Sequence, residues 1–152
     1  MRRTFVRVAT AVIAALFVSA GMSDEKAAQS DLARLQGEWT MVSGEIQGEA
    51  MPDEIRTTAR RVAKENETTV TVGGQLFMKA KFTLVPAKTP KTIDYEMTGG
   101  PTEGKKQLGI YEFDGEQVRF CFGSPGKERP TEFKTGAGDG RTLSVWKRVK
   151  VR

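Results

Sequence analysis

The chain has 152 residues, with 24 Lys or Arg, 19 Asp or Glu, no His and one Cys. Without His, a Ser-His-Asp triad and a His-bound metal site are excluded, and a single Cys can form neither an intrachain disulfide nor a thiolate zinc cluster. The length suits one domain with one hydrophobic core.

Residues 1–20 predict a secretory signal peptide. Three arginines precede an apolar run from Val8 to Val18, and Ser19 and Ala20 are the small residues that a signal peptidase requires. The apolar run is too short to span a membrane comfortably, so we expect cleavage after Ala20, an exported periplasmic or extracellular protein, and no stable membrane span afterwards. Cleavage leaves 132 residues with a net charge of +2, compared with +5 for the whole chain.

Basic residues are scattered among acidic ones through the rest of the chain. The pairs Arg60-Arg61 and Lys147-Arg148 are short clusters, which we interpret as solvated faces of strands. This pattern lacks the concentrated basic stripe of a nucleic-acid-binding protein, so no nucleic-acid partner is expected.

The segment 21–29 is small and polar and predicts a flexible leader. A short helix follows, because Ser30 can cap it and because Leu32 and Leu35 share one of its sides. After Gly37 the hydrophobic period changes from that of a helix to that of strands. We therefore place a single β domain at residues 30–152, including the short helix.

The clearest strand runs from 75 to 85, where apolar and polar side chains alternate. One face of that run carries Leu76, Met78, Ala80, Phe82 and Leu84. Two neighbouring runs alternate in the same way, with Val70 and Val72 on one face of the first, and Ile93, Tyr95 and Met97 on one face of the second. Such alternation is typical of half-buried antiparallel strands.

Residues 107–122 predict a hairpin around Asp114-Gly115, with two possible registers. A two-residue turn places Tyr111 and Phe113 on the face of Val118 and Phe120. A three-residue loop instead groups Leu108 and Ile110 with Val118, Phe120 and Phe122. The second register gives the cleaner apolar face and is the one that we favour. A slip of one residue inverts every side chain, so the choice matters.

The remaining elements are shorter. Residues 51–57 predict a helical turn or lid, because Pro52 and Asp53 suit a helix start, and 131–135 can form a short edge strand. The last strand is expected at 142–149, with Leu143, Val145 and Val149 on one face. About eight strands at close spacing favour a meander closed into a barrel, or a sandwich.

The motif Gly37-Glu38-Trp39 stands between the short helix and the first strand. This arrangement resembles the start of a lipocalin-type (calycin) barrel. The resemblance implies that Trp39 packs at the closed end of the barrel under a basic side chain from the last strand. Arg148 is the expected partner and Lys147 the alternative.

Three further segments extend the resemblance, in the same order along the chain. Together with Leu35 to Trp39, they are Lys91 to Asp94, Gly109 to Glu112, and Arg129 to Phe133. They are similar to a paralogous family of small exported lipocalin-like proteins expanded in planctomycete bacteria. The resemblance implies an all-β, antiparallel up-and-down barrel of about eight strands with a short N-terminal helix, and it brings no catalytic residues. Residues 60–66 depart from the family pattern, which puts the second strand in doubt.

Two functional hypotheses follow. In the first, the barrel carries a small apolar ligand among six interior residues: Met78, Phe82, Tyr95, Met97, Phe120 and Phe122. In the second, side chains fill the barrel, and the protein is an interaction or envelope module that meets a protein partner through the loops at 51–53, 99–105 and 123–130. We expect no enzymatic activity, cofactor or metal. Large inward side chains predict a filled core, whereas small ones that face a gap predict a pocket.

Overall fold

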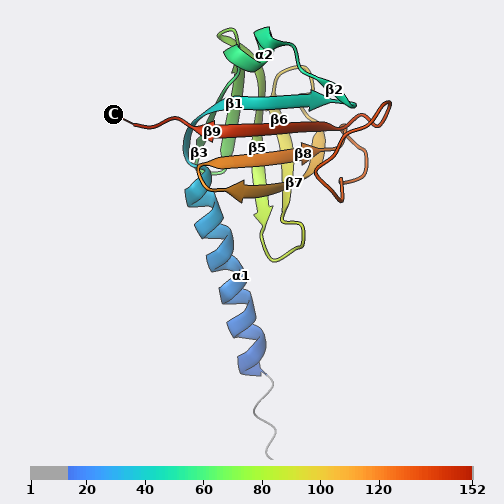
Figure 1. The fold of residues 1–152 in the computed structure, drawn as a ribbon. Helices are drawn as coiled ribbons and strands as arrows, with labels where there is room; N and C mark the ends of the chain where they lie inside the picture. The colour runs from blue at the N-terminus through green and yellow to red at the C-terminus, as the bar shows by residue number, and fades with distance from the viewer. Residues whose placement is uncertain (1–13, 152) are drawn as a thin grey trace, which may run out of the picture.

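The computed structural model describes the backbone of residues 14–151 and the side chains of residues 21–151. Most of the predicted signal peptide, residues 1–20, lies outside the described residues. Figure 1 shows a barrel of strands with one helix projecting from an end. The helices and strands are α1 (Ala14–Leu35), β1 (Gly37–Ile46), β2 (Glu49–Ala50), α2 (Asp53–Thr58), β3 (Arg60–Lys64), β4 (Glu67–Val72), β5 (Gln75–Val85), β6 (Thr92–Gly99), β7 (Lys106–Asp114), β8 (Gln117–Phe122) and β9 (Thr142–Arg148).

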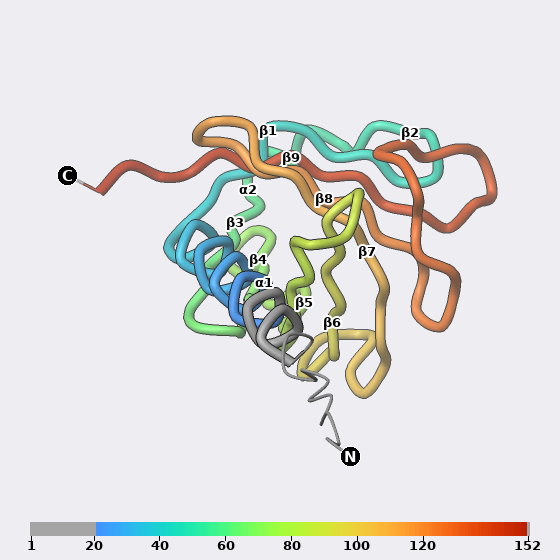
Figure 2. The backbone as a smooth tube through the Cα atoms, turned by 90° about the horizontal axis from the view of Figure 1, so that it is seen from below, coloured from blue at the N-terminus to red at the C-terminus, as the bar shows by residue number. Residues whose placement is uncertain are grey.

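The sheet is an antiparallel meander that closes on itself. Each strand from β3 to β8 pairs with the next along the chain, and β1 pairs with both β3 and β9. The two-residue β2 pairs only with the end of β1, so it stands at the edge of the sheet. Figure 2 looks along the barrel from the helix end and shows this ring of strands. The predicted all-β barrel of lipocalin type is confirmed, with eight strands in the closed ring.

The N-terminal helix is longer than the sequence pattern predicts. Residues 21–29, expected as a flexible leader, instead continue α1, because Glu25, Lys26, Ala27 and Ala28 are good helix formers. Only the last part of α1 packs on the barrel, through buried Leu35 and partly buried Leu32. Gly37 follows with a φ of 106°, a left-handed conformation that lets the chain turn sharply from helix into strand.

The strands alternate as expected over most of the barrel. Met78, Ala80, Phe82 and Leu84 of β5 are buried, as are Ile93, Tyr95 and Met97 of β6. Leu76 is the exception, with 53% of its surface exposed, because it lies at the rim beside the β4–β5 turn. The helix expected after Pro52 is confirmed as α2, and the doubtful second strand is present as β3.

The register favoured for the 107–122 hairpin is wrong. Asp114 pairs with Gln117, which leaves a two-residue turn, and Tyr111 lies opposite Phe120 on the inner face. Ile110 faces outward beside Cys121, and both are fully buried. The outer face is apolar here because the loop between β8 and β9 covers it, as the contact of the Cys121 thiol with the Lys134 carbonyl at 3.7 Å shows. In this hairpin, the face with the cleaner apolar pattern is therefore not the face that points into the barrel.

The loop between β8 and β9 also explains two other differences between the sequence prediction and the structure. Residues 131–135, predicted as an edge strand, form no strand and cross the outside of the barrel instead. In β9, the residues Leu143 and Val145 do share a face, but it is the outer one. The inner face of β9 carries Trp146, which lies opposite Met41 and Val118 and is almost completely buried.

Candidate functional site

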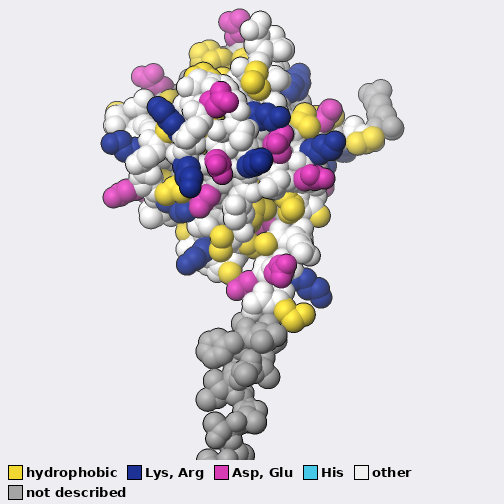
Figure 3. Space-filling view, turned by 180° about the vertical axis from the view of Figure 1, so that it is seen from behind, with side chains coloured by type: hydrophobic (Ala, Val, Ile, Leu, Met, Phe, Trp, Pro, Cys, Tyr) yellow, Lys and Arg dark blue, Asp and Glu magenta, His cyan; other side chains and the backbone are white. Residues whose placement is uncertain are grey.

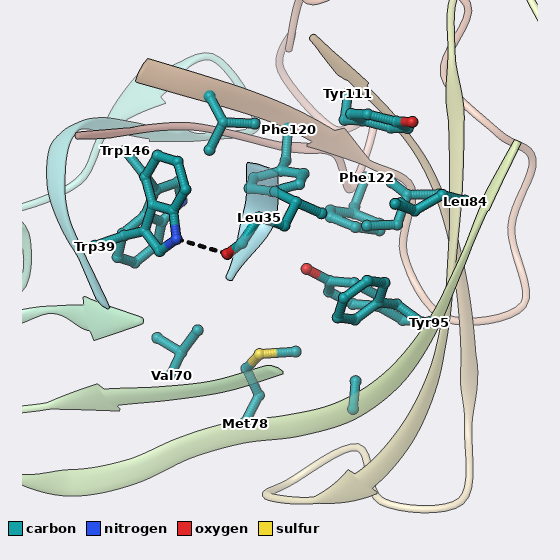
Figure 4. Packing of buried hydrophobic residues seen from close by; sticks show 14 of the residues in the cluster. Leu35, Trp39, Val70, Met78, Leu84, Tyr95, Tyr111, Phe120, Phe122 and Trp146 are labelled. Carbon is teal, nitrogen blue, oxygen red and sulfur yellow. Dashed lines mark hydrogen bonds between the residues drawn. The ribbon is translucent and has the colours of Figure 1, made fainter. Parts of the chain in front are cut away.

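The six side chains expected to line a ligand pocket do meet inside the barrel, but they leave almost no space. All six are buried in one apolar cluster, and the rings of Tyr95 and Phe122 lie 4.2 Å apart (Figure 4). The cavity among the inward side chains has a volume of about 10 Å³. That volume holds about one water-sized particle, whereas pockets for small organic ligands span roughly 300–1,000 Å³. In this structure the side chains fill the barrel.

Arg61 is the unexpected member of the interior. The interpretation of Arg60-Arg61 as a solvated face is wrong for Arg61, which lies opposite Trp39 on the inner face of β3 and is only 6% exposed. Its Nη1 donates to the Tyr95 hydroxyl at 2.8 Å and to the Thr68 hydroxyl at 3.1 Å. The neighbouring Val62 points outward instead and is 44% exposed, so hydropathy predicts the opposite arrangement.

Two aromatic rings complete the surroundings of this guanidinium. Its Cζ lies 4.7 Å from the centroid of the Phe120 ring and 4.6 Å from that of Trp146. Such contacts stabilise a desolvated cation by about 2 kcal/mol. A sequence pattern could not have found this arrangement, because the groups that contact Arg61 come from four other strands.

The motif residues lock the helix end of the barrel. The guanidinium of Arg148 lies 4.3 Å from the Trp39 ring, and its Nη1 donates to the Gln36 carbonyl at 2.6 Å. The indole Nε1 of Trp39 donates to the carbonyl of Leu35 at 2.9 Å (Figure 4). Lys147, the alternative partner, is exposed. The motif thus serves to join α1 to both β1 and β9.

Asp31 is the second attachment of α1 to the barrel. Its buried carboxylate accepts hydrogen bonds from the Tyr111 hydroxyl at 2.7 Å and from Lys91 Nζ at 2.8 Å. Burial, together with the hydrogen bond to this carboxylate, raises the pKa of Tyr111 well above its ordinary value. The network joins three distant parts of the chain, which indicates a structural role.

A much larger hollow lies at the end of β1 that is remote from α1. This groove has a volume of about 470 Å³. It is lined by Ile46, Gln47, Glu49, Ala50, Met51, Pro52, Ala137 and Gly138. Of the three loops expected to form an interaction surface, only 51–53 contributes to this groove; neither 99–105 nor 123–130 lines it.

Hydrogen bonds fix the two sides of the groove relative to each other. The Gly48 amide donates to the Thr135 hydroxyl at 2.8 Å, and the Gln47 amide donates to the Arg141 carbonyl at 3.0 Å. The hydroxyl of Thr135 in turn donates to the carboxylate of Glu45. The β1–β2 turn and the turn at 136–140 therefore form a connected frame around the hollow.

Other chemistry finds little support in the described part of the chain. Within residues 21–151, no three His, Cys, Asp or Glu side chains gather as a metal site would require. Figure 3 shows basic and acidic side chains interspersed on one face of the barrel. No helix among the described residues is long and apolar enough to cross a membrane. In comparisons with known proteins, no protein-family model, curated protein or solved structure matches this chain.

Proposed function

We propose that the protein is an exported, filled-barrel binding module that holds a segment of a partner protein in the groove beside β2. The observation that carries this proposal is the contrast between a barrel interior with about 10 Å³ of space and a surface groove of about 470 Å³. Of these two spaces, the groove is the one that falls within the size range of ligand sites. Export rests on the signal-like pattern of residues 1–20.

The chemistry of the groove suits an extended peptide with an apolar side chain. Ile46 is 40% exposed there, and Ala50, Met51, Pro52 and Ala137 add apolar surface. Because a Met side chain is flexible and polarisable, it adapts to differently shaped partners. An apolar side chain of the partner would gain burial on this surface, while the polar groups at the rim of the groove remain available for its backbone.

The edge position of β2 supports the same class of partner. β2 pairs with β1 on one side, and no described strand pairs with its other side. An unpaired strand edge offers backbone donors and acceptors to an extended chain, which is a common mode of peptide recognition. A free edge beside a groove lined by both polar and apolar residues favours a protein segment over a compact apolar molecule such as a lipid or retinoid.

A peptide library selected against the purified mature protein tests this proposal. The exposed Ala137 allows a groove-blocking variant, Ala137→Arg, and the exposed Ala87 at the opposite end of the barrel allows a matched control, Ala87→Arg. Selected peptides should bind the wild type and Ala87→Arg equally and lose at least about tenfold in affinity for Ala137→Arg, or 1.4 kcal/mol. Failure to select any peptide, or equal binding by both variants, would overturn the proposal.

The same preparation tests the carrier hypothesis. We expect no saturable binding of a fluorescent fatty-acid or retinoid analogue, because the interior has no room for one. Stoichiometric binding that weakens in a folded Phe120→Asp variant would place the ligand inside the barrel and restore the carrier.

A further inference from the structure

The barrel interior contains a positive charge without a negative partner. Arg61 carries this charge on its guanidinium group. The described residues form six ion pairs, and none of them involves Arg61. Burial of an unpaired charge is costly, so such groups are normally paired or bound to a counter-ion.

The contacts of Arg61 balance this cost only in part. Nη1 has two neutral hydroxyl partners, and the aromatic rings of Phe120 and Trp146 attract the cation. The Nε atom, however, is buried and has no hydrogen-bond partner among the described residues. One N–H donor of a charged group therefore remains unsatisfied in the interior.

The small interior cavity lies against these same groups. Its wall includes Arg61, Thr68 and Tyr95, and the rest of the wall is mostly apolar. Both hydroxyl oxygens accept from Nη1, and neither hydroxyl donates to any other described residue. Their hydrogens are therefore free to turn toward a particle in the cavity. One charged donor and two hydroxyl donors converge on a space that is closed at the helix end by Leu35.

We propose that this cavity binds one monatomic anion of chloride size, with Arg61 as its counter-charge. A volume of about 10 Å³ has no room for the several oxygens of a carboxylate, phosphate or sulfate. A water molecule would satisfy the Nε donor but would leave the positive charge uncompensated. A halide satisfies both requirements, and this site is independent of the groove beside β2.

Thermal unfolding at constant ionic strength tests the site. Sodium chloride is exchanged stepwise for sodium gluconate, whose anion is too large to enter, and chloride and bromide are compared. If the dissociation constant is one-tenth of the chloride concentration, binding shifts the unfolding equilibrium about elevenfold and raises Tm by about 5 °C. Because each sample is unfolded and refolded in its own salt, the ion is captured as the barrel closes.

Two variants separate this effect from general salt effects. Arg61→Met removes the buried charge, and Arg60→Met removes the same charge from the exposed neighbour on β3. The halide-dependent shift should persist in Arg60→Met and vanish in Arg61→Met. An equal shift in all three proteins, or no shift in the wild type, would overturn the proposal.

A crystallographic experiment on the wild type keeps the proposal testable if Arg61→Met does not fold. Crystals grown in sodium bromide should show an anomalous peak in the cavity, within hydrogen-bond distance of Arg61 Nε. A cavity that contains only water, without anomalous signal at saturating bromide, would overturn the proposal and show that Arg61 is a structural residue stabilised by its hydroxyl and aromatic neighbours.

Discussion

Trp39→Ala should be the most damaging single truncation at the helix end of the barrel. The indole is almost completely buried, donates a hydrogen bond to the Leu35 carbonyl and lies under Arg148. A buried Trp removes up to about 250 Å² from water, which at 25 cal/mol per Å² gives an upper bound of about 6 kcal/mol. Because the site collapses in part and its backbone stays buried, we expect a loss of about 3–5 kcal/mol in the free energy of unfolding.

Urea denaturation followed by circular dichroism measures this loss. Trp39→Phe is the matched control, because it keeps an aromatic ring and removes only the N–H donor and part of the ring; its loss should be about 1–2 kcal/mol. Trp146, the second Trp of the chain, provides an independent fluorescence signal in both variants. A Trp39→Ala midpoint within about 1 kcal/mol of the wild type would refute the argument that this residue anchors α1 to the barrel.

Three further predictions concern other contacts. Asp31→Asn should lower the free energy of unfolding by about 1–2 kcal/mol, because it weakens the acceptor for Tyr111 and the pair with half-exposed Lys91; Asp24→Asn, on the exposed part of α1, should have no effect on the urea midpoint. Ile110→Ala should lower the free energy of unfolding by about 2–4 kcal/mol, although its side chain lies outside the barrel. A negligible loss would contradict the conclusion that a loop covers this outer face. Burial raises the pKa of the Cys121 thiol. The contribution of the neutral thiol to the free energy of unfolding should therefore be fully present below the ordinary thiol pKa and should be lost as the pH rises toward the raised value. In Cys121→Ala, urea titrations at several pH values should no longer show this decline in stability at alkaline pH. A pH profile identical to that of the wild type would contradict the prediction.

The general architecture could be predicted from the sequence because the meander makes its contacts locally. The alternation in β5 and β6 identifies their inner faces, and Pro52-Asp53 marks the start of α2. Each of these signals arises within one element or between neighbours in the chain. The packing of Trp39 under Arg148 at the helix end is a long-range contact, and it was expected only from the resemblance of the Gly37-Trp39 motif to lipocalin-type barrels.

The error at residues 21–29 is local, because good helix formers were interpreted as a flexible leader. The errors within the barrel share another cause, which is long-range contact that no local pattern reports. Ile110 and Cys121 are buried on the outer face because a distant loop covers them. Arg61 is buried because Tyr95, Phe120 and Trp146 supply its partners from elsewhere in the barrel. The groove also depends on such a contact, between the β1–β2 turn and Thr135.

The central claim is that the barrel is filled and that binding occurs at the groove beside β2. A crystal structure of the protein purified from its own host tests this claim most directly, because any molecule carried inside would be retained. We expect density for at most one ion or water molecule beside Arg61, with Phe82, Met97 and Phe120 packed against one another. Extended density for an organic ligand among these side chains, with the barrel widened around it, would contradict the account.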